Sequence, residues 1–239
     1  MQKLTRVSNY DIWYLDNFYD DPDQVREYAL SLNYSRSNSD LFPGVRSGLT
    51  EEFYSYFLRL FEDKISLTPF DIKTGFHKIS ILHENLNSKL NTGFIHVDLF
   101  EHFLKGKKTF AGVIYLNKKT CSTGGTSFFK MKCTTGREIK IIDNDNFNLF
   151  NSLHDNGLHH DIFFHEYIKV YNPFIKRKYL NYFLKNKEIV DSKFEKVIEV
   201  ENVYNRLVFY DSTYFHTVNH FYVNDFEDRL TQPFFIKIL

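Results

Sequence analysis

Two early segments of the chain place apolar residues at helical spacing. The first opens on Asp20-Asp21-Pro22-Asp23, whose capping carboxylates and early proline are typical of a helix start. The spacing of the apolar residues that follow predicts a helix over residues 22–33 with one buried face. These residues are Val25, Tyr28, Ala29 and Leu32. A second helix is predicted from Thr50 onward, with Phe53, Phe57, Leu60 and Phe61 turned inward.

From Lys73 the pattern changes to short β-type runs separated by turn residues. An aromatic run over residues 10–19 predicts one earlier strand, and residues 42–46 a turn. Closely spaced strands after two helices indicate a mainly β, double-sheet fold with helical support from residues 1–72. The predicted strands are Gly75–Leu82, Gly93–Asp98, Thr109–Leu116, Thr126–Lys130, Arg137–Ile142, Asp161–Val170, Arg206–Tyr210, Phe215–Asn219 and Leu230–Ile238.

A long stretch, residues 130–204, separates two groups of these strands. Part of it, residues 176–190, has apolar residues at helical spacing. We interpret the stretch as an insertion in a single domain that spans residues 1–239.

Composition narrows the class of protein. Aromatic residues make up 18% of the 239, which favours a β-rich interior. The formal net charge is +0, without the basic excess of proteins that wrap a phosphate backbone, so nucleic acid is disfavoured as a partner. With two cysteines, no apolar signal-peptide core and no run long enough to span a bilayer, we expect a cytoplasmic protein without membrane association. The Asn, Lys, Ile, Phe and Tyr content is typical of AT-rich genomes, such as those of phages.

Candidate metal ligands begin with His96-Val97-Asp98. Residues two apart on an extended chain point to the same side, so this imidazole and carboxylate face one point. Alone, the triplet is more often a surface histidine beside a solvated aspartate. His216, just after another predicted strand, adds a second imidazole. Two histidines and one carboxylate on one side of a metal leave positions open, which is the non-haem iron(II) arrangement of oxygenases.

A candidate anion site follows on the last predicted strand. Arg229 lies 13 positions after His216, and Thr231 shares its strand face. A guanidinium in a dry pocket with a hydroxyl beside it suits the distal end of a dicarboxylate.

These residues belong to an ordered set along the chain. The set resembles the iron(II)/2-oxoglutarate-dependent oxygenase superfamily, most closely its prolyl-hydroxylase-like branch. Residues 16–18, Pro22, residues 25–26 and residues 42–46 also look like a little-studied subgroup of that branch. The set comprises His96-Val97-Asp98, Val113-Ile114-Tyr115-Leu116-Asn117, Gly124-Gly125-Thr126-Ser127-Phe128, Asn205-Arg206-Leu207-Val208-Phe209, His216 and Arg229-Leu230-Thr231.

The resemblance implies a double-stranded β-helix, or jelly roll, and a hydroxylating dioxygenase that uses Fe(II), 2-oxoglutarate and O2. It implies His96, Asp98 and His216 as metal ligands and catalytic residues. It also implies that Arg229, Tyr115 and, with less support, Thr231 hold 2-oxoglutarate, and that residues 124–126 form a turn. The presence of Asp98 argues against halogenating variants. The substrate would be a peptidyl, prolyl or small-molecule group; the oligomeric state is not indicated.

Other readings stay open. A jelly roll that keeps its metal without turnover, as a binding module, would carry the same residues. A second histidine group could bind zinc, although a solvated or substrate-facing strand explains it better. A reactive cysteine and a phosphate-binding basic run are also possible, although a loop cysteine and a solvated helix start explain these residues better. Two histidines near the proposed ligands are expected to point elsewhere. These residues are His154, His159, His160, Asp161 and His165; Cys121 and Cys133; Lys176-Arg177-Lys178; and His102 and His220.

Overall fold

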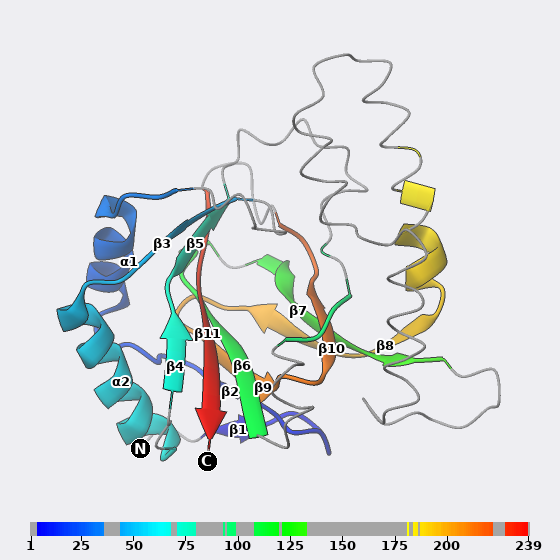
Figure 1. Ribbon diagram of the computed structural model, residues 1–239, viewed down its shortest axis with the longest axis horizontal. Helices are drawn as coiled ribbons and strands as arrows, with labels where there is room; N and C mark the ends of the chain where they lie inside the picture. Colours follow the sequence, from blue (N-terminus) through cyan, green and yellow to red (C-terminus); the bar gives the residue numbers. More distant parts are fainter. Residues whose placement is uncertain are drawn as a thin grey trace.

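The computed structural model describes residues 4–35, 44–67, 71–79, 93, 95–98, 108–119, 121–132, 181, 184–185, 187–221 and 228–238. Within them, two antiparallel sheets face each other, and two helices cover the outer side of the larger one (Figure 1). The described part of the chain has no helix long and apolar enough to cross a membrane.

The larger sheet has eight strands in the order β1-β2-β9-β6-β11-β5-β3, with β4 also paired to β11. β11 is therefore its central strand, since it pairs with β4, β5 and β6. The bounds are β1 Thr5–Arg6, β2 Ile12–Leu15, β3 Val45–Ser47, β4 Asp71–Thr74, β5 Phe76–Ile79, β6 Lys108–Tyr115, β9 Leu207–Asp211 and β11 Arg229–Ile238.

The smaller sheet consists of β7 (Cys121–Met131), β8 (Phe194–Asn202) and β10 (Phe215–Val218), in the order β10-β7-β8. A short backbone bridge between His96 and His216 lies along the free edge of β10. Side chains from both sheets meet in one buried cluster, to which Tyr115 and Tyr210 contribute from the large sheet and Phe128 from the small one. This cluster is the interior of the fold.

Strand alternation decides which residues enter that interior. On β11, Arg229 and Thr231 face the small sheet, whereas Leu230 and Phe234 face the helices, because successive strand residues point to opposite sides. Tyr115 lies directly opposite Thr231 across the β6–β11 pair, so it shares the interior face. A one-residue shift of register would exchange the two faces.

The helices begin where their capping residues predict. The Asp21 side chain accepts from the Gln24 N–H at the start of α1 (Pro22–Ser31), and Thr50 accepts from the Phe53 N–H before α2 (Glu51–Ile65). On α2, Phe57, Leu60, Phe61 and Ile65 are buried at helical spacing against the outer face of the large sheet. The helices thus seal the sheet face that points away from the interior.

Several elements differ from the prediction. The strand expected over residues 10–19 covers only Ile12–Leu15, and β1, β3 and β4 were not predicted. β1, β2 and β3 lie within residues 1–72, the region expected as helical support, and all three join the large sheet. β8 lies inside the stretch interpreted as an insertion, yet it pairs with β7, so this part belongs to the small sheet. Within the same stretch, residues 187–191 are helical, as expected for its last part.

Residues 124–126 lie within β7 beside a register irregularity, where a turn was expected. Gly125 packs against β8 so closely that a Cβ there would lie 1.9 Å from the Val200 carbonyl oxygen. Only a residue without a side chain permits this approach of two backbones.

Gly125→Ala is therefore expected to lower the free energy of unfolding by about 1–3 kcal/mol, because backbone must shift to make room. Urea denaturation followed by circular dichroism measures it. Gly48→Ala is the matched control, since a Cβ at Gly48 meets nothing within 4 Å. Equal stability of the two variants would show that β7 and β8 can separate at no cost.

Candidate metal centre

Three side chains from distant parts of the chain converge at one edge of the interior. His96, Asp98 and His216 each offer a ligand atom, and these atoms lie within 4.8 Å of one another. His216 Nε2 is 3.1 Å from Asp98 Oδ2, and His96 Nε2 is 3.7 Å from Asp98 Oδ1. The two imidazole rings lie 4.3 Å apart between centroids. Two nitrogens and a carboxylate therefore face a common point, as the sequence predicted.

β10 and the turn that precedes it position all three. His216 is on β10, and two backbone hydrogen bonds with His96, of 3.0 and 2.9 Å, hold that residue beside it. The Asp98 N–H donates to the Ser212 carbonyl, in the turn between β9 and β10, at 2.8 Å. β10 and this turn thus fix the backbone of every candidate ligand.

The orientation of the His216 ring suits metal binding. Its Nδ1 lies 2.8 Å from the Tyr214 carbonyl oxygen. A carbonyl can only accept, so Nδ1 is the donor to it, and Nε2 is the nitrogen that faces Asp98 and the candidate metal position. Orienting a metal-binding imidazole through its second nitrogen in this way is common in metalloproteins.

Asp98 is held as a carboxylate. Burial raises the pKa of its side chain, but the charges of His216 and His96 and hydrogen bonds to His216 and Tyr210 outweigh burial. The pKa of Asp98 therefore lies below its ordinary value, and the group offers an ionised ligand at neutral pH.

Arg229 is a buried cation. It is 6% exposed. Within the part of the chain that the structure describes, the guanidinium contacts the Gly124 carbonyl at 3.3 Å and the Thr231 hydroxyl at 3.5 Å, and its Nε has no hydrogen-bond partner there. Among the described residues, no carboxylate pairs with it. Burial lowers the pKa of the guanidinium to about 10, which leaves it charged at neutral pH. An unpaired buried charge of this kind indicates a place for an anion.

Tyr115 and Thr231 lie beside Arg229 on the interior face. The Tyr115 hydroxyl is 2.7 Å from the Thr126 hydroxyl, and burial raises its pKa, so it keeps its proton. Tyr115, Tyr210 and Phe128 belong to one buried cluster, and the Phe128 ring lies 6.2 Å from that of His216. The cation and the three converging ligands therefore border the same interior.

The sequence prediction missed two participants, Tyr210 and Gly124. Tyr210 is buried, and its ring lies 4.7 Å from that of His216. Gly124 contributes its carbonyl to Arg229. Tyr210 carried one available signal: it lies on a predicted strand close before His216.

Among the other candidates that the structure describes, His220 does not join this group. His220 lines a pocket of about 530 Å³ together with Ser127 and Thr217, which alternate with the inward-facing Phe128 and His216 along their strands. Cys121 begins β7. The remaining candidates lie outside the described residues: His102, His154, His159, His160, Asp161, His165, Cys133 and residues 176–178.

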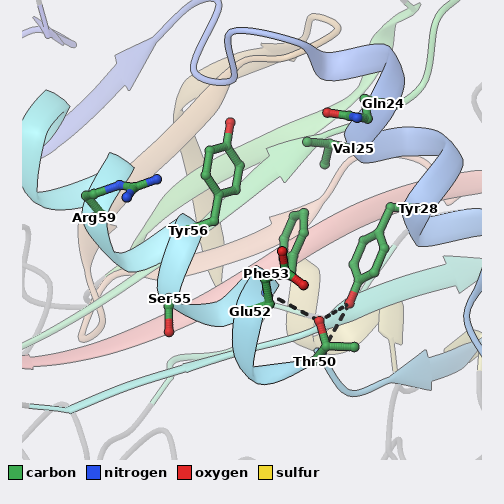
Figure 2. A pocket seen from close by; sticks show the side chains of 9 residues that line it. All are labelled: Gln24, Val25, Tyr28, Thr50, Glu52, Phe53, Ser55, Tyr56 and Arg59. Carbon is green, nitrogen blue, oxygen red and sulfur yellow. Dashed lines mark hydrogen bonds between the residues drawn. The ribbon is translucent and has the colours of Figure 1, made fainter.

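A second hollow, of about 640 Å³, lies between α1 and α2, on the far side of the large sheet from these ligands (Figure 2). Its wall is aromatic: the rings of Tyr28 and Phe53 stack at 4.5 Å, and the Tyr28 hydroxyl contacts Thr50. Glu52 is the one carboxylate among its described lining residues, so they do not provide a metal site.

Comparison with known proteins places the chain in a family and a fold. Residues 2–178 match a family described as "Family of unknown function (DUF6445)". The matched range contains His96, Asp98 and Tyr115, whereas His216 and Arg229 lie beyond it. No curated protein matches the chain.

Three solved structures resemble it. HygX from Streptomyces hygroscopicus, with nickel and 2-oxoglutarate bound, has a TM-score of 0.50 and 12% identity, covering 95% of this chain and 82% of its own. A Pseudomonas putida prolyl-4-hydroxylase has a TM-score of 0.43 and 13% identity, covering 97% and 95%. The alpha ketoglutarate dependent epimerase SnoN from nogalamycin biosynthesis has a TM-score of 0.45 and 11% identity, covering 95% and 78%. The similarity to HygX confirms the predicted double-stranded β-helix, or jelly roll.

Proposed function

The chain belongs to the DUF6445 family of unknown function, and since membership assigns no activity, we propose that the protein is an iron(II)- and 2-oxoglutarate-dependent oxygenase of an organic substrate. The metal ligands are His96, Asp98 and His216. Arg229 and Tyr115 bind 2-oxoglutarate, with Thr231 beside them.

One observation carries this proposal: a buried guanidinium, which has no carboxylate partner among the described residues, borders the same interior as a His-Asp-His cluster. Burying an unpaired charge costs several kcal/mol, roughly, so a ligand that supplies the missing anion is strongly favoured. 2-Oxoglutarate carries a carboxylate at each end. It can pair one with Arg229 and present the other, with its keto oxygen, to a metal.

The donor set fits iron(II). Two imidazoles and one carboxylate lack the thiolates of structural zinc or copper sites and leave coordination positions open. HygX, whose fold this chain shares, binds nickel and 2-oxoglutarate. That is consistent with the proposal, although the likeness itself concerns the fold.

In this proposal, the chain's own residues bind and orient the co-substrate and keep water out of the site. Arg229 and Tyr115 fix the far carboxylate of the co-substrate: the guanidinium pairs with its charge, and the neutral hydroxyl donates a hydrogen bond to it. The apolar side chains of the interior, such as Phe128 and Val208, keep water from the site and strengthen these contacts. Bound iron would supply the redox chemistry with O2, and the protein supplies geometry.

In this proposal residues 1–239 form one oxygenase domain, and the substrate is a small molecule or a peptidyl group. Incubation of the protein with iron(II), 2-oxoglutarate and a metabolite or peptide extract, followed by a search for a mass gain of one oxygen, identifies that substrate.

The direct test needs no substrate. Aerobic incubation with iron(II) and 2-oxoglutarate is expected to yield succinate slowly, and omission of either iron or O2 is expected to stop it. Chromatography of the acids measures this. Binding of metal and 2-oxoglutarate without any succinate would instead identify a binding module. Failure to bind either one would refute the proposal.

A further inference from the structure

Asn202, at the end of β8, is a buried polar residue that the proposed roles above do not use. It follows Ile198 and Val200 on the interior face of the strand, and both of these are apolar and buried. Asn202 is 1% exposed, yet neither its side-chain oxygen nor its side-chain nitrogen has a hydrogen-bond partner among the described residues. A third apolar side chain would continue the pattern, so packing does not explain an amide at this position.

A buried amide without a hydrogen bond is costly, and in folded proteins such a group is normally satisfied by an ordered water or by a ligand. The side chain of an asparagine carries two N–H donors and one acceptor oxygen, so its nitrogen can bind an anion. The surroundings of Asn202 decide between these two partners.

The backbone of Asn202 packs against the glycine pair of β7. A Cβ built on Gly125 would lie 3.0 Å from the Asn202 backbone nitrogen, and the carbonyl of the neighbouring Gly124 accepts from Arg229 at 3.3 Å. Asn202 comes from the small sheet and Arg229 from the large one. The two residues therefore approach the same short segment from opposite sides of the interior.

The same end of β8 borders the other residues proposed to hold 2-oxoglutarate. Val200, two residues before Asn202, lies opposite Thr126 in the β7–β8 pair. The Thr126 hydroxyl is 2.7 Å from the Tyr115 hydroxyl, and Tyr115 lies opposite Thr231 in the large sheet. Asn202 is thus placed at the edge of this group.

Arg229 and Asn202 share one property. In the part of the chain that the structure describes, the Arg229 Nε and both polar atoms of the Asn202 side chain are buried without a hydrogen-bond partner. A carboxylate has two oxygens, so one anion can accept from both side chains. A water could satisfy the amide, but it would leave the charge of the guanidinium uncompensated.

We infer that Asn202 is a further binding residue of the proposed site: its side-chain nitrogen donates to the far carboxylate of 2-oxoglutarate, whose charge pairs with Arg229. The inference rests on the proposed function, because it assigns a role at the same site. It makes Asn202 one of the residues that select a 2-oxo acid with a second carboxylate over one without it.

Asn202→Ala removes the amide. Fluorescence titration of the Co²⁺-loaded protein with 2-oxoglutarate is expected to show about 10- to 100-fold weaker binding, because a hydrogen bond to a charged group is lost. The affinity for Co²⁺ itself should stay unchanged. So should the affinity for 2-oxobutyrate, which has no far carboxylate.

The matched control is Ser127→Ala. Ser127 is 0% exposed and its hydroxyl also has no partner among the described residues, but it alternates with the inward-facing Phe128 and lines the pocket on the other side of the small sheet. Its replacement is expected to leave the affinity for 2-oxoglutarate unchanged. An equal loss in both variants would overturn the inference, because the effect would then be a general loss of structure.

Asn202→Asp keeps the size of the side chain and adds a negative charge. If position 202 lies beside Arg229, the new carboxylate pairs with the guanidinium, and the melting temperature without 2-oxoglutarate is expected to rise. The same charge would repel the co-substrate and weaken its binding by at least about 100-fold. A carboxylate buried away from Arg229 would instead lower the melting temperature.

Unchanged affinity of Asn202→Ala for 2-oxoglutarate would overturn the inference and identify a bound water as the partner of the amide. If Asn202→Ala fails to fold, Asn202→Asp decides: a lower melting temperature or normal 2-oxoglutarate binding would overturn the inference. If the unmodified protein binds no 2-oxoglutarate, the proposed function fails and the role of Asn202 fails with it. If it binds 2-oxoglutarate and Asn202→Ala binds it equally well, only the role of Asn202 fails.

Discussion

Asp98→Ala is expected to abolish succinate formation and to weaken iron(II) or Co²⁺ binding by at least about 100-fold, more than loss of a supporting hydrogen bond would. Asp98 is the one anionic ligand of the cluster, and its oxygens are 3.1 and 3.7 Å from the two imidazole nitrogens. Without it, only the two imidazoles of the cluster remain. Isothermal titration with Co²⁺ and the succinate assay measure the two effects.

His220→Ala is the matched control for this prediction. His220 follows His216 by four positions but lines a separate pocket with Ser127 and Thr217. Its replacement is expected to leave metal binding and succinate formation unchanged. Equal losses in the two variants would show that the cluster of His96, Asp98 and His216 is not the metal site.

Arg229→Met is expected to have two opposite effects. The affinity for 2-oxoglutarate should fall by about 2–4 kcal/mol, or roughly 30- to 1000-fold, because the charged partner of its carboxylate is lost. In the absence of 2-oxoglutarate, the free energy of unfolding should rise by about 1–4 kcal/mol, since an unpaired buried charge is replaced by an apolar side chain. Fluorescence titration and urea denaturation measure the two quantities.

Arg206→Met is the control, and its free energy of unfolding is expected to change in the opposite direction. Arg206 is also largely buried, but Asp16 accepts two hydrogen bonds from it, at 2.5 and 2.9 Å. Its loss removes this two-point ion pair, so this variant should be less stable and should bind 2-oxoglutarate normally. If Arg229→Met proved less stable than the unmodified protein and bound 2-oxoglutarate as tightly, Arg229 would be a structural cation and not an anion receptor.

Many of the strands could be predicted because their local sequence pattern is typical of β structure. Three predicted strands match β6, β10 and β11 with no end displaced by more than one residue; their predicted spans are Thr109–Leu116, Phe215–Asn219 and Leu230–Ile238. The helix starts could be predicted equally well, since the side chains of Asp21 and Thr50 cap the first turns. Local chemistry sufficed for these elements.

β8 carried a readable pattern that the insertion hypothesis obscured. Ile198 and Val200 are buried and alternate with the exposed Glu199 and Glu201, as expected for a strand with one covered face. The short strands β1 and β3 are different. They have only two and three residues, too few for any alternation to register, and they form because neighbouring strands offer free backbone groups.

The site was half predictable for a related reason. Strand spacing places His96 with Asp98, and Arg229 with Thr231, on common faces, so each pair could be inferred from sequence. The backbone contact of Asp98 with Ser212 could not be inferred in this way. It depends on how the turn after β9 meets the segment that carries Asp98, and that long-range register is set by packing and not by either segment alone.

The alternation along β11 has a practical consequence for anyone who alters this protein. Leu230, Phe234 and Ile236 contact only the helical side, while Arg229 and Thr231 serve the interior. Libraries that vary Leu230, Phe234 and Ile236 can therefore search for higher thermal stability without changing the residues proposed to bind the co-substrate. Conversely, deletion of a single residue within β11 would move the side chains beyond it to the opposite faces of the sheet. The protein should therefore tolerate substitutions in this strand far better than deletions or insertions.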